Sequence, residues 1–389
     1  MSTSVDAGRG WVAPLERGGS AGAVIAEKMV RPRPVGHTAA TLDSHAVSTL
    51  PHEAAVIVGA GPIGLACAIS ARRHGVDPLV IDAGAIAESI VRYPIGMVFF
   101  TTPERLEIGE HPLVSAGGKP TREEALKYYR GVARTERLRV RTYTRLVGAT
   151  RRDGRSELEL GTRLGPARLS TDRVVLATGY FDHPNRLEVP GEDLPHVSHY
   201  FDEAHRSFGL DVVVIGGKNS AVEAALQLFR AGARVTLVYR GTQLPASVKY
   251  WLKPDFENRV KAGEIAARLG ATVERITATA VAIRRSDGQP ETIAADRVYA
   301  LTGFHADTEL FRRLAIAFDG VTARPQIDPQ SLETSVPGIY VAGSVIAGNK
   351  ISEIFIENGR FDGEKIFGDP AARLAAQAGY EAIHRPAGE

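Results

Sequence analysis

A glycine-rich turn between an apolar strand and a helix occurs twice in this chain, and this repeat restricts the fold more than any other feature. The first copy runs from AAVIV through GAGPIG to LVIDAG, and the second runs from DVVVI through GGKNSA to VTLVYRG. Each copy predicts a strand, a tight turn, a helix and a second strand, which together form a βαβ unit. The spacing is similar, because 23 residues separate Gly59 from Asp82 and 24 separate Gly216 from Arg240. The sequence therefore predicts an α/β fold with two Rossmann-like, three-layer nucleotide-binding domains.

The first turn, GAGPIG, contains the complete G-x-G-x-x-G pattern and precedes a predicted helix. Its first glycine allows the tight turn, its second lets the backbone approach a pyrophosphate, and its third lets helix and strand pack closely. Unpaired N–H groups at the helix N-terminus suit phosphate oxygens. The acid that ends the second strand is placed to accept hydrogen bonds from a ribose hydroxyl. The predicted nucleotide-binding residues are Gly59, Gly61, Pro62, Ile63, Gly64 and Asp82.

The second turn departs from this pattern, with Lys218 in place of the second glycine and Ala221 in place of the third. Lys218 either keeps the backbone further from a phosphate or supplies its own charge. The following strand ends at Arg240 with no acid nearby, and arginine suits the 2′-phosphate of NADP, whereas an acid would select NAD. The alternative is a solvated charge at the end of the strand. We predict that NADPH binds Gly216, Lys218, Asn219, Ser220, Ala221 and Arg240.

Charge and cysteine content argue against several classes of protein. A net charge of +2, from 47 basic and 45 acidic residues, gives no electrostatic footprint for nucleic acid or an anionic membrane. Cys67 is the single cysteine, so the chain has no intrachain disulfide and no internal CxxC pair, and a cytoplasmic location is expected. The longest apolar stretch, residues 54–69, contains glycines and a proline and is shorter than the roughly 20 residues of a membrane span. No His, Cys or Asp cluster has metal-ligand spacing, so no metal is predicted.

The layout of two nucleotide units resembles the thioredoxin reductase-like and glutathione reductase-type flavoproteins, in which a pyridine-nucleotide domain is inserted into a FAD domain. The segment ETSVPGIYVAGSVIAG looks like the second FAD motif of that superfamily, although the usual Gly-Asp is Gly343-Ser344 here, a weaker hydrogen-bonding substitute. VVLATG and VYALTG are apolar strands that end in a small-Thr-Gly turn and suit crossings between domains near a cofactor. The resemblance implies that FAD also contacts Thr178, Gly179, Gly343 and Ser344.

These signals divide the chain into domains. We predict a discontinuous FAD-binding domain at residues 52–189 and 298–368 and an inserted NADPH-binding domain at 190–297. Residues 1–51 are rich in Gly, Ser, Pro, Ala and Arg without a clear period, which predicts a disordered N-terminal extension. Residues 369–389 are expected to form a C-terminal tail, first helical and then coil.

Longer strings resemble one family more specifically. ESIVRYPIGMVFFTTPERLEIG, KPTREEALKYYR, GGKNSAVEAAL, SVKYWLKPDFENRVKAGEI and ISEIFIENGRFDGEKI are similar to the YpdA-type bacillithiol-disulfide or bacilliredoxin reductases, over about residues 53–368. This resemblance implies an enzyme that passes hydride from NADPH to FAD and on to an external acceptor. The expected acceptor is a small-molecule disulfide or the disulfide of a redoxin. A homodimer or higher homo-oligomer is expected by analogy.

The catalytic thiol does not carry over with the resemblance. The YpdA-type family is associated with a cysteine inside the first turn, GxGPCG, where this chain has Ile63. Thioredoxin reductases place a CxxC before the second turn, and the corresponding stretch here has no cysteine. Cys67 is one helical turn beyond Ile63 amid apolar residues, so a buried core cysteine is the favoured interpretation and a redox thiol the alternative.

Three alternatives remain open from the residues. A ferredoxin or quinone would replace the disulfide in a reductase without a redox thiol. A flavin monooxygenase is suggested by residues 177–191 with His196, His199 and Tyr200, although the usual Phe-x-Gly pair is absent. A non-catalytic nucleotide sensor is the third. The polar residues Glu353, Glu357 and Asn358, in the region where a flavin ring would lie, bear only weakly on the choice.

Several other residues have two interpretations. Thr121 and Glu124 form a capping-box pattern ahead of a helix whose Tyr128 and Tyr129 are explained better by core packing than by catalysis. Residues 249–251, Lys-Tyr-Trp, could cover the nicotinamide or adenine, or form a surface aromatic cluster. His305 either is structural or faces the flavin.

Overall fold

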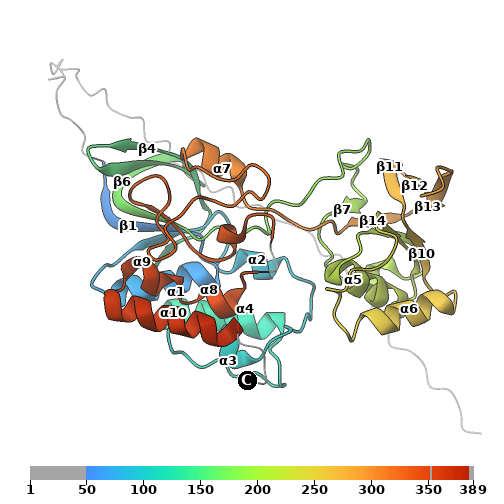
Figure 1. Ribbon diagram of the computed structural model, residues 1–389, viewed down its shortest axis with the longest axis horizontal. Coiled ribbons are helices and arrows are strands. Elements are labelled where there is room, and N and C mark those ends of the chain that lie inside the picture. Colours follow the sequence, from blue (N-terminus) through green and yellow to red (C-terminus); the bar gives the residue numbers. More distant parts are fainter. Residues whose placement is uncertain (1–49, 351–352, 385–389) are drawn as a thin grey trace, which may run out of the picture. The chain divides into compact units, whose positions relative to one another are not determined.

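The computed structural model describes residues 50–350 and 353–384 (Figure 1). The predicted disordered extension therefore falls almost wholly outside the described residues, and the first described element is β1 (His52–Val58). Elements then follow in the order strand, helix, strand at both glycine turns. The prediction of an α/β fold with two Rossmann-type units is confirmed.

The first sheet has seven strands in the order β3-β2-β1-β6-β5-β4, and β15 pairs with β6. Strands β3, β2, β1, β6 and β15 run parallel, whereas β5 and β4 complete the sheet as antiparallel strands. The bounds are β2 (Leu79–Ile81), β3 (Arg139–Arg141), β4 (Thr144–Arg152), β5 (Arg155–Thr162), β6 (Gly165–Leu176) and β15 (Ile339–Val341).

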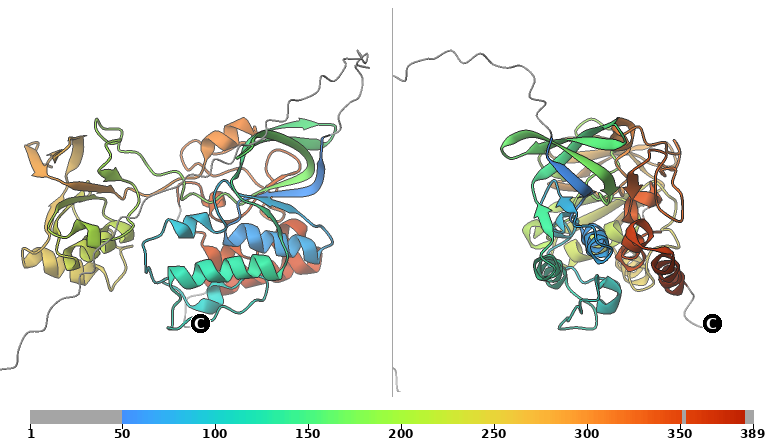
Figure 2. Two further views of the ribbon diagram at one scale, coloured as in Figure 1. Left: turned by 180° about the vertical axis from the view of Figure 1, so that it is seen from behind. Right: turned by 90° about the vertical axis from the view of Figure 1, so that its left-hand side faces the viewer.

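Alternation along β1 sends side chains into two separate cores. Ala55 and Ile57 pack with helix residues, and Val56 and Val58 pack with residues of β4–β6 and α7 on the other face. Figures 1 and 2 show α1, α4, α9 and α10 on one side of this sheet. The helices of this unit are α1 (Pro62–Arg73), α2 (Glu88–Val91), α3 (Pro103–Leu106), α4 (Arg122–Thr135), α7 (Thr308–Arg313), α8 (Ile356–Gly359), α9 (Asp362–Phe367) and α10 (Pro370–His384).

The second sheet has five parallel strands in the order β10-β9-β8-β14-β7. Core residues of α5 and α6 cover one face, and a three-stranded antiparallel sheet, β11-β12-β13, covers the other. The bounds are β7 (Val197–Ser198), η1 (His205–Ser207), β8 (Asp211–Ile215), α5 (Asn219–Arg230), β9 (Arg234–Tyr239), α6 (Lys253–Lys261), β10 (Ala266–Leu269), β11 (Thr272–Ile276), β12 (Ala280–Arg284), β13 (Pro290–Ala294) and β14 (Arg297–Ala300). The predicted boundary at residue 298 lies within β14, which belongs wholly to this sheet.

Both small-Thr-Gly turns follow the ends of parallel strands, β6 and β14, and lead into two connecting segments that bond to each other. The N–H of Asn185 donates to the carbonyl of Gly303 at 2.9 Å, and the hydroxyl of Thr302 donates to the carbonyl of Asn185 at 2.6 Å. The rings of Phe181 and Phe304 lie 4.4 Å apart, centroid to centroid. The two connections therefore run as a paired ribbon rather than as separate loops.

The predicted helix cap is present at α4. The side chain of Thr121 accepts from the N–H of Glu124 at 3.2 Å, and the carboxylate of Glu124 accepts from the N–H of Thr121 at 2.7 Å. Tyr129 is fully buried and donates to the carbonyl of Leu106 at 2.9 Å, which agrees with its predicted role in core packing.

Candidate functional site

The first glycine turn connects β1 to α1 and tolerates no larger residue at two positions. Gly59 has φ +112°, and a Cβ atom there would lie 2.3 Å from the carbonyl oxygen of Ala177. A Cβ atom on Gly64 would lie 1.8 Å from the carbonyl oxygen of Gly59. Gly61, in contrast, faces open space, with nothing within 4 Å of a Cβ placed on it. The turn is therefore packed tightly on its protein side and open at the residue expected to approach a pyrophosphate.

The N-terminus of α1 is free to receive a phosphate. Its N-cap residue, Gly61, has no side-chain cap, Pro62 occupies the first turn, and no acidic residue lies in that turn. Unpaired N–H groups and the positive end of the helix dipole therefore face the open side of the glycine turn.

Asp82 braces the same turn from the end of β2. Its Oδ2 accepts from the N–H of Ala60 at 2.6 Å, and its Oδ1 accepts from the N–H of Gly84 at 2.7 Å. Burial raises the pKa of Asp82, and these two hydrogen bonds oppose that rise. Each carboxylate oxygen keeps capacity for a further donor, so the brace is compatible with the predicted bond to a ribose hydroxyl.

Three segments distant in the sequence meet at the carboxyl ends of β1, β6 and β15. A Cβ atom on Gly343 would lie 3.0 Å from the side chain of Ile63, and one on Gly179 would lie 3.7 Å from Oγ of Ser344. The hydroxyl of Thr178 is buried there and has no hydrogen-bond partner in the described residues. A buried, unpaired hydroxyl needs a ligand or water as its partner. The residues at this meeting point therefore fit a bound polar group such as the chain of a flavin.

Asp362, at the start of α9, was not anticipated from the sequence. The residue is 4 % exposed, and its Oδ2 accepts from the N–H of Gly343 at 2.7 Å. Burial raises its pKa from the ordinary 3.8 to about 7. A single Asp in the string FDGEK carries no local signal for this role, because its partner lies 19 residues earlier in the chain.

The second glycine turn connects β8 to α5 and is equally tight. A Cβ atom on Gly216, where φ is +142°, would lie 2.5 Å from the carbonyl oxygen of Leu301 and 3.0 Å from Cβ of Ala221. One on Gly217 would lie 2.5 Å from the ring of Tyr239. Small residues are therefore required at the first and third positions of this motif, whereas the second position, Lys218, is exposed.

Basic groups surround the N-terminus of α5. Lys218 is its N-cap residue, no acid lies in its first turn, and Arg240 is exposed at the end of β9. Neither cation has an ion pair among the described residues. Asn219 accepts from the N–H of Lys249 at 2.9 Å, which ties the helix start to the loop of residues 249–251. Two uncompensated cations beside a helix N-terminus suit a ligand with several phosphates.

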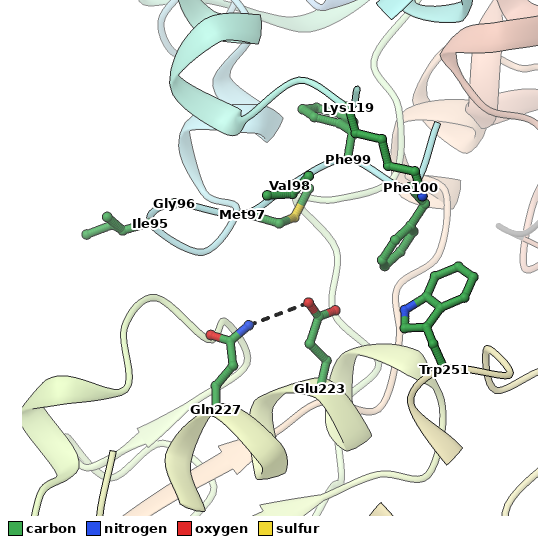
Figure 3. A pocket seen from close by; sticks show the side chains of 10 residues that line it. All are labelled: Ile95, Gly96, Met97, Val98, Phe99, Phe100, Lys119, Glu223, Gln227 and Trp251. Atoms are coloured by element: carbon green, nitrogen blue, oxygen red, sulfur yellow. Dashed lines mark hydrogen bonds between the residues drawn. The ribbon is translucent and has the colours of Figure 1, made fainter. Parts of the chain in front are cut away.

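A pocket of about 410 Å³ opens on α5 one turn beyond this site (Figure 3). Glu223 and Gln227 of α5 face residues 96–100, and Trp251 faces Phe100 with ring centroids 5.8 Å apart. Burial raises the pKa of Glu223, whose Oε1 accepts from the Gln227 amide at 3.5 Å. Glu223 was not anticipated from the sequence, although it follows the GGKNSA turn by two residues. Of the predicted cluster at 249–251, Trp251 lines the pocket, whereas Tyr250 is 83 % exposed.

Cys67 lies on α1 in the hydrophobic core, where α9 packs against this helix. It is 0 % exposed, and burial, with further contributions from Asp362 and Glu364, raises its pKa well above the ordinary value. A thiol with a raised pKa stays protonated at neutral pH and is a poor nucleophile. The geometry thus favours the interpretation of Cys67 as a core residue.

The histidines and the tyrosine predicted near the small-Thr-Gly turns have local surroundings of their own. His199 lies between the carbonyl of Ala300, 3.2 Å from Nδ1, and Glu192, 3.2 Å from Nε2. Nδ1 of His305 lies 2.8 Å from the carbonyl of Ala306. Nε2 of His196 is buried without a partner in the described residues. The hydroxyl of Tyr200 donates to the carbonyl of Phe181 at 2.8 Å.

The side chain of Asn358 forms hydrogen bonds with nearby backbone groups. Asn358 accepts from the N–H of Phe355 and donates to the carbonyl of Glu353, and both contacts help to start α8. Glu357 pairs with Arg105 at 3.4 Å. Within residues 50–350 and 353–384, no three His, Cys, Asp or Glu side chains gather as metal ligands. None of the helices in that part of the chain has the length and apolar character of a membrane span.

Comparison with known proteins agrees with this geometry. A family model described as pyridine nucleotide-disulphide oxidoreductase matches residues 56–343. Bacilliredoxin reductase Bdr of Bacillus subtilis is 43% identical over 321 residues, which cover 82% of this chain and 98% of that protein. The solved bacillithiol disulfide reductase Bdr (YpdA) of Bacillus cereus has a TM-score of 0.80 at 42% identity, covering 84% of this chain and 99% of its own. Thioredoxin reductase of T. acidophilum, at 20% identity and a TM-score of 0.65, shares the fold, with 84% of this chain and 99% of its own covered.

Proposed function

The chain belongs to the pyridine nucleotide-disulphide oxidoreductase family, and from this premise we propose that it is an FAD-containing, NADPH-dependent disulfide reductase. It is an oxidoreductase that uses a flavin and a pyridine nucleotide. In the proposed reaction NADPH and a proton reduce a disulfide, RSSR, to two thiols, RSH, and NADP⁺ is released. The flavin, when bound, supplies the hydride acceptor and electron donor between the two substrates.

The observation that carries the cofactor assignment is the opposite charge beside the two glycine turns. Asp82 braces the first turn and suits the free ribose hydroxyls of the adenosine in FAD. Lys218 and Arg240 flank the second turn and suit the 2′-phosphate that distinguishes NADPH from NADH. We therefore assign FAD to the residues predicted around the first turn, with Thr178, Gly179, Gly343 and Ser344, and NADPH to those predicted around the second.

The corresponding domains follow the two sheets. We propose a discontinuous FAD-binding domain with an NADPH-binding domain inserted into it, for which the sequence predicts residues 52–189 with 298–368 and residues 190–297. Because β14 pairs with β8, we place the return crossing after Ala300 rather than at residue 298.

The pocket beside α5 is proposed to receive the nicotinamide. The carboxylate of Glu223 suits the amide N–H groups of a carboxamide, and its partial burial keeps competing water away. Trp251 and Phe100 supply an apolar wall on the same pocket. These residues would orient the nicotinamide, while the flavin carries the electron transfer.

The acceptor is proposed to be bacillithiol disulfide or a bacilliredoxin disulfide. The Bdr proteins of Bacillus subtilis and Bacillus cereus are named for these two substrates. In this chain Ile63 replaces the cysteine of the first turn, and Cys67 is buried with a raised pKa. We therefore propose that electrons reach the acceptor disulfide without a protein thiol, unlike the route implied by the family resemblance.

Anaerobic stopped-flow absorbance tests this proposal. The bound flavin is reduced with one equivalent of NADPH and then mixed with bacillithiol disulfide, an oxidised bacilliredoxin, a ferredoxin or a quinone in parallel. Fast reoxidation by either disulfide supports the proposal. Reoxidation only by ferredoxin, quinone or oxygen would remove disulfide reduction from this chain and leave an acceptor reductase or a monooxygenase.

We further propose a homodimer or higher homo-oligomer in the cytoplasm. The oligomeric state is proposed by analogy with related folds. The cytoplasmic location is proposed because the single cysteine is buried and needs no oxidising compartment. Sedimentation of the purified chain would test the oligomeric state directly.

A further inference from the structure

The buried side chain of Asp362 forms a hydrogen bond with the backbone of the turn after β15. Its carboxylate accepts from the N–H of Gly343, the first residue of η2 (Gly343–Ala347), and Ile63 packs against the same glycine. Gly343 has φ +74°, a conformation that residues with a Cβ atom rarely adopt. Ser344 follows at once and lies near Gly179. A carboxylate that is 4 % exposed thus fixes the backbone of a turn assigned to the flavin.

In the described part of the chain, the charged and titratable groups beside this carboxylate come from α9, α1 and α10. Lys365 of α9 stabilises its ionised form, and its Nζ lies 5.0 Å from the ring of Tyr380 on α10. Cys67 of α1 is buried beside it, because a Cβ atom on Gly363 would lie 2.8 Å from Cα of Cys67. Glu364 is engaged elsewhere, since it accepts from Ser70 at 2.7 Å and pairs with His74 at 2.8 Å. Among the described residues, Lys365 is the cation that lowers the pKa of Asp362, and burial outweighs it and raises this pKa to about 7.

We propose that Asp362 is a positioning residue for the flavin, whose carboxylate fixes the Gly343–Ser344 turn and whose protonation weakens flavin binding. The inference rests on the proposed function, because it requires that this turn contacts a flavin. A hydrogen bond to an ionised acceptor is stronger than one to a neutral acceptor by roughly 1.4 kcal/mol. That difference converts to an affinity change of about ten-fold. By linkage, bound flavin lowers the pKa of Asp362 in return.

The test is a titration of the full-length, flavin-free chain with FAD on either side of the pKa of about 7. Flavin fluorescence quenching gives the Kd at each pH. The wild-type chain is expected to bind FAD about ten-fold more weakly below this pKa than above it. D362N keeps an oxygen acceptor for Gly343 and cannot ionise, so its Kd is expected to be independent of pH and close to the wild-type value at low pH.

Two further variants separate this role from general effects of pH. E364Q changes a carboxylate on the same helix that does not contact Gly343, and it is expected to keep the wild-type pH dependence. K365M removes the cation that stabilises ionised Asp362, so the pH midpoint of FAD binding is expected to rise. The K365M titration provides the same test if D362N fails to fold.

The outcomes distinguish this inference from the proposed function. A wild-type Kd that does not vary with pH, or a pH dependence that D362N retains or K365M leaves unmoved, overturns the role of Asp362 and leaves FAD binding intact. A wild-type chain that binds no FAD at any pH overturns the proposed function, and the role of Asp362 falls with it.

Discussion

Oδ2 of Asp82 accepts a hydrogen bond of 2.6 Å from the backbone N–H of Ala60, so the acid that ends β2 holds the glycine turn that follows β1. The second oxygen accepts from Gly84 at 2.7 Å. One side chain therefore connects the two loops between which a nucleotide is proposed to lie. The shape of the first turn depends on this contact as well as on its glycines.

Replacement of Asp82 is expected to weaken FAD binding. D82A removes both hydrogen bonds to the backbone and the proposed bond to the ribose, a loss of about 2 kcal/mol or more, or roughly 30-fold in Kd. D82N keeps an acceptor and is expected to lose less. FAD titration of the flavin-free chain measures both, with E110Q as the control because the Glu110 side chain is 86% exposed. Equal affinity in D82A and E110Q would refute the role of Asp82.

Arg240 is expected to select NADPH over NADH. R240Q removes a charge proposed to contact the 2′-phosphate, so KM for NADPH should rise about ten-fold while KM for NADH changes little. Steady-state reduction with both nucleotides gives the ratio of kcat/KM values. R275Q, at an exposed arginine of β11, controls for loss of surface charge. An equal loss of kcat/KM with NADH would mean that Arg240 does not contact the 2′-phosphate.

Glu223 is expected to orient the nicotinamide rather than to hold the rest of NADPH. E223Q keeps the shape of the side chain and removes its charge, so flavin reduction by NADPH should slow by about ten-fold with a smaller change in the Kd for NADP⁺. Pre-steady-state absorbance separates these two quantities. E257Q, on α6 of the same sheet unit, is the matched control because its side chain is 47% exposed. An unchanged reduction rate in E223Q would count against the pocket as the nicotinamide site.

Cys67 is expected to be dispensable for turnover. Burial raises the pKa of its thiol, so it should react slowly with iodoacetamide in the folded chain at neutral pH. C67A should keep disulfide reductase activity within about two-fold and lose roughly 1 kcal/mol of stability through the small cavity. The measurements are turnover with bacillithiol disulfide and denaturant unfolding. Loss of turnover in C67A with normal flavin content would restore the redox-thiol interpretation.

Asp362 is expected to make the stability of the flavin-free chain depend on pH. Its pKa is raised from 3.8 to about 7, so its contribution is fully present below about pH 4 and is lost as the pH rises through 7. The difference of about three pKa units corresponds to a loss on the order of 4 kcal/mol. D362N should therefore gain stability over the wild type above pH 7 and gain none near pH 4. Denaturant unfolding at both pH values measures this difference in stability. An equal difference between D362N and the wild type at both pH values would mean that ionisation of Asp362 does not cause the pH dependence.

Local pattern was sufficient to predict both nucleotide units. Their apolar strands, glycine turns and helices follow rules that act over a few residues, and β1, α1, β8 and α5 lie where the repeat predicted them. The capping box of Thr121 and Glu124 is equally local. The pairing of strands, in contrast, depends on contacts between distant segments of the chain. Residue 298 was predicted to begin a segment of the FAD domain, but β14 pairs with β8 in the second sheet.

By itself, then, the sequence determined the α/β class, the two glycine turns and the different charges beside them, because each of these properties is contained in a short stretch of chain. Only the tertiary structure decided which distant residues meet. It placed Ile63 against Gly343, left the hydroxyl of Thr178 without a partner among the residues that the structure describes, and put the carboxylate of Asp362 against the turn after β15. The pKa of Asp362 and the inaccessibility of Cys67 depend on burial by several helices, and burial is a property of the assembled fold rather than of any segment.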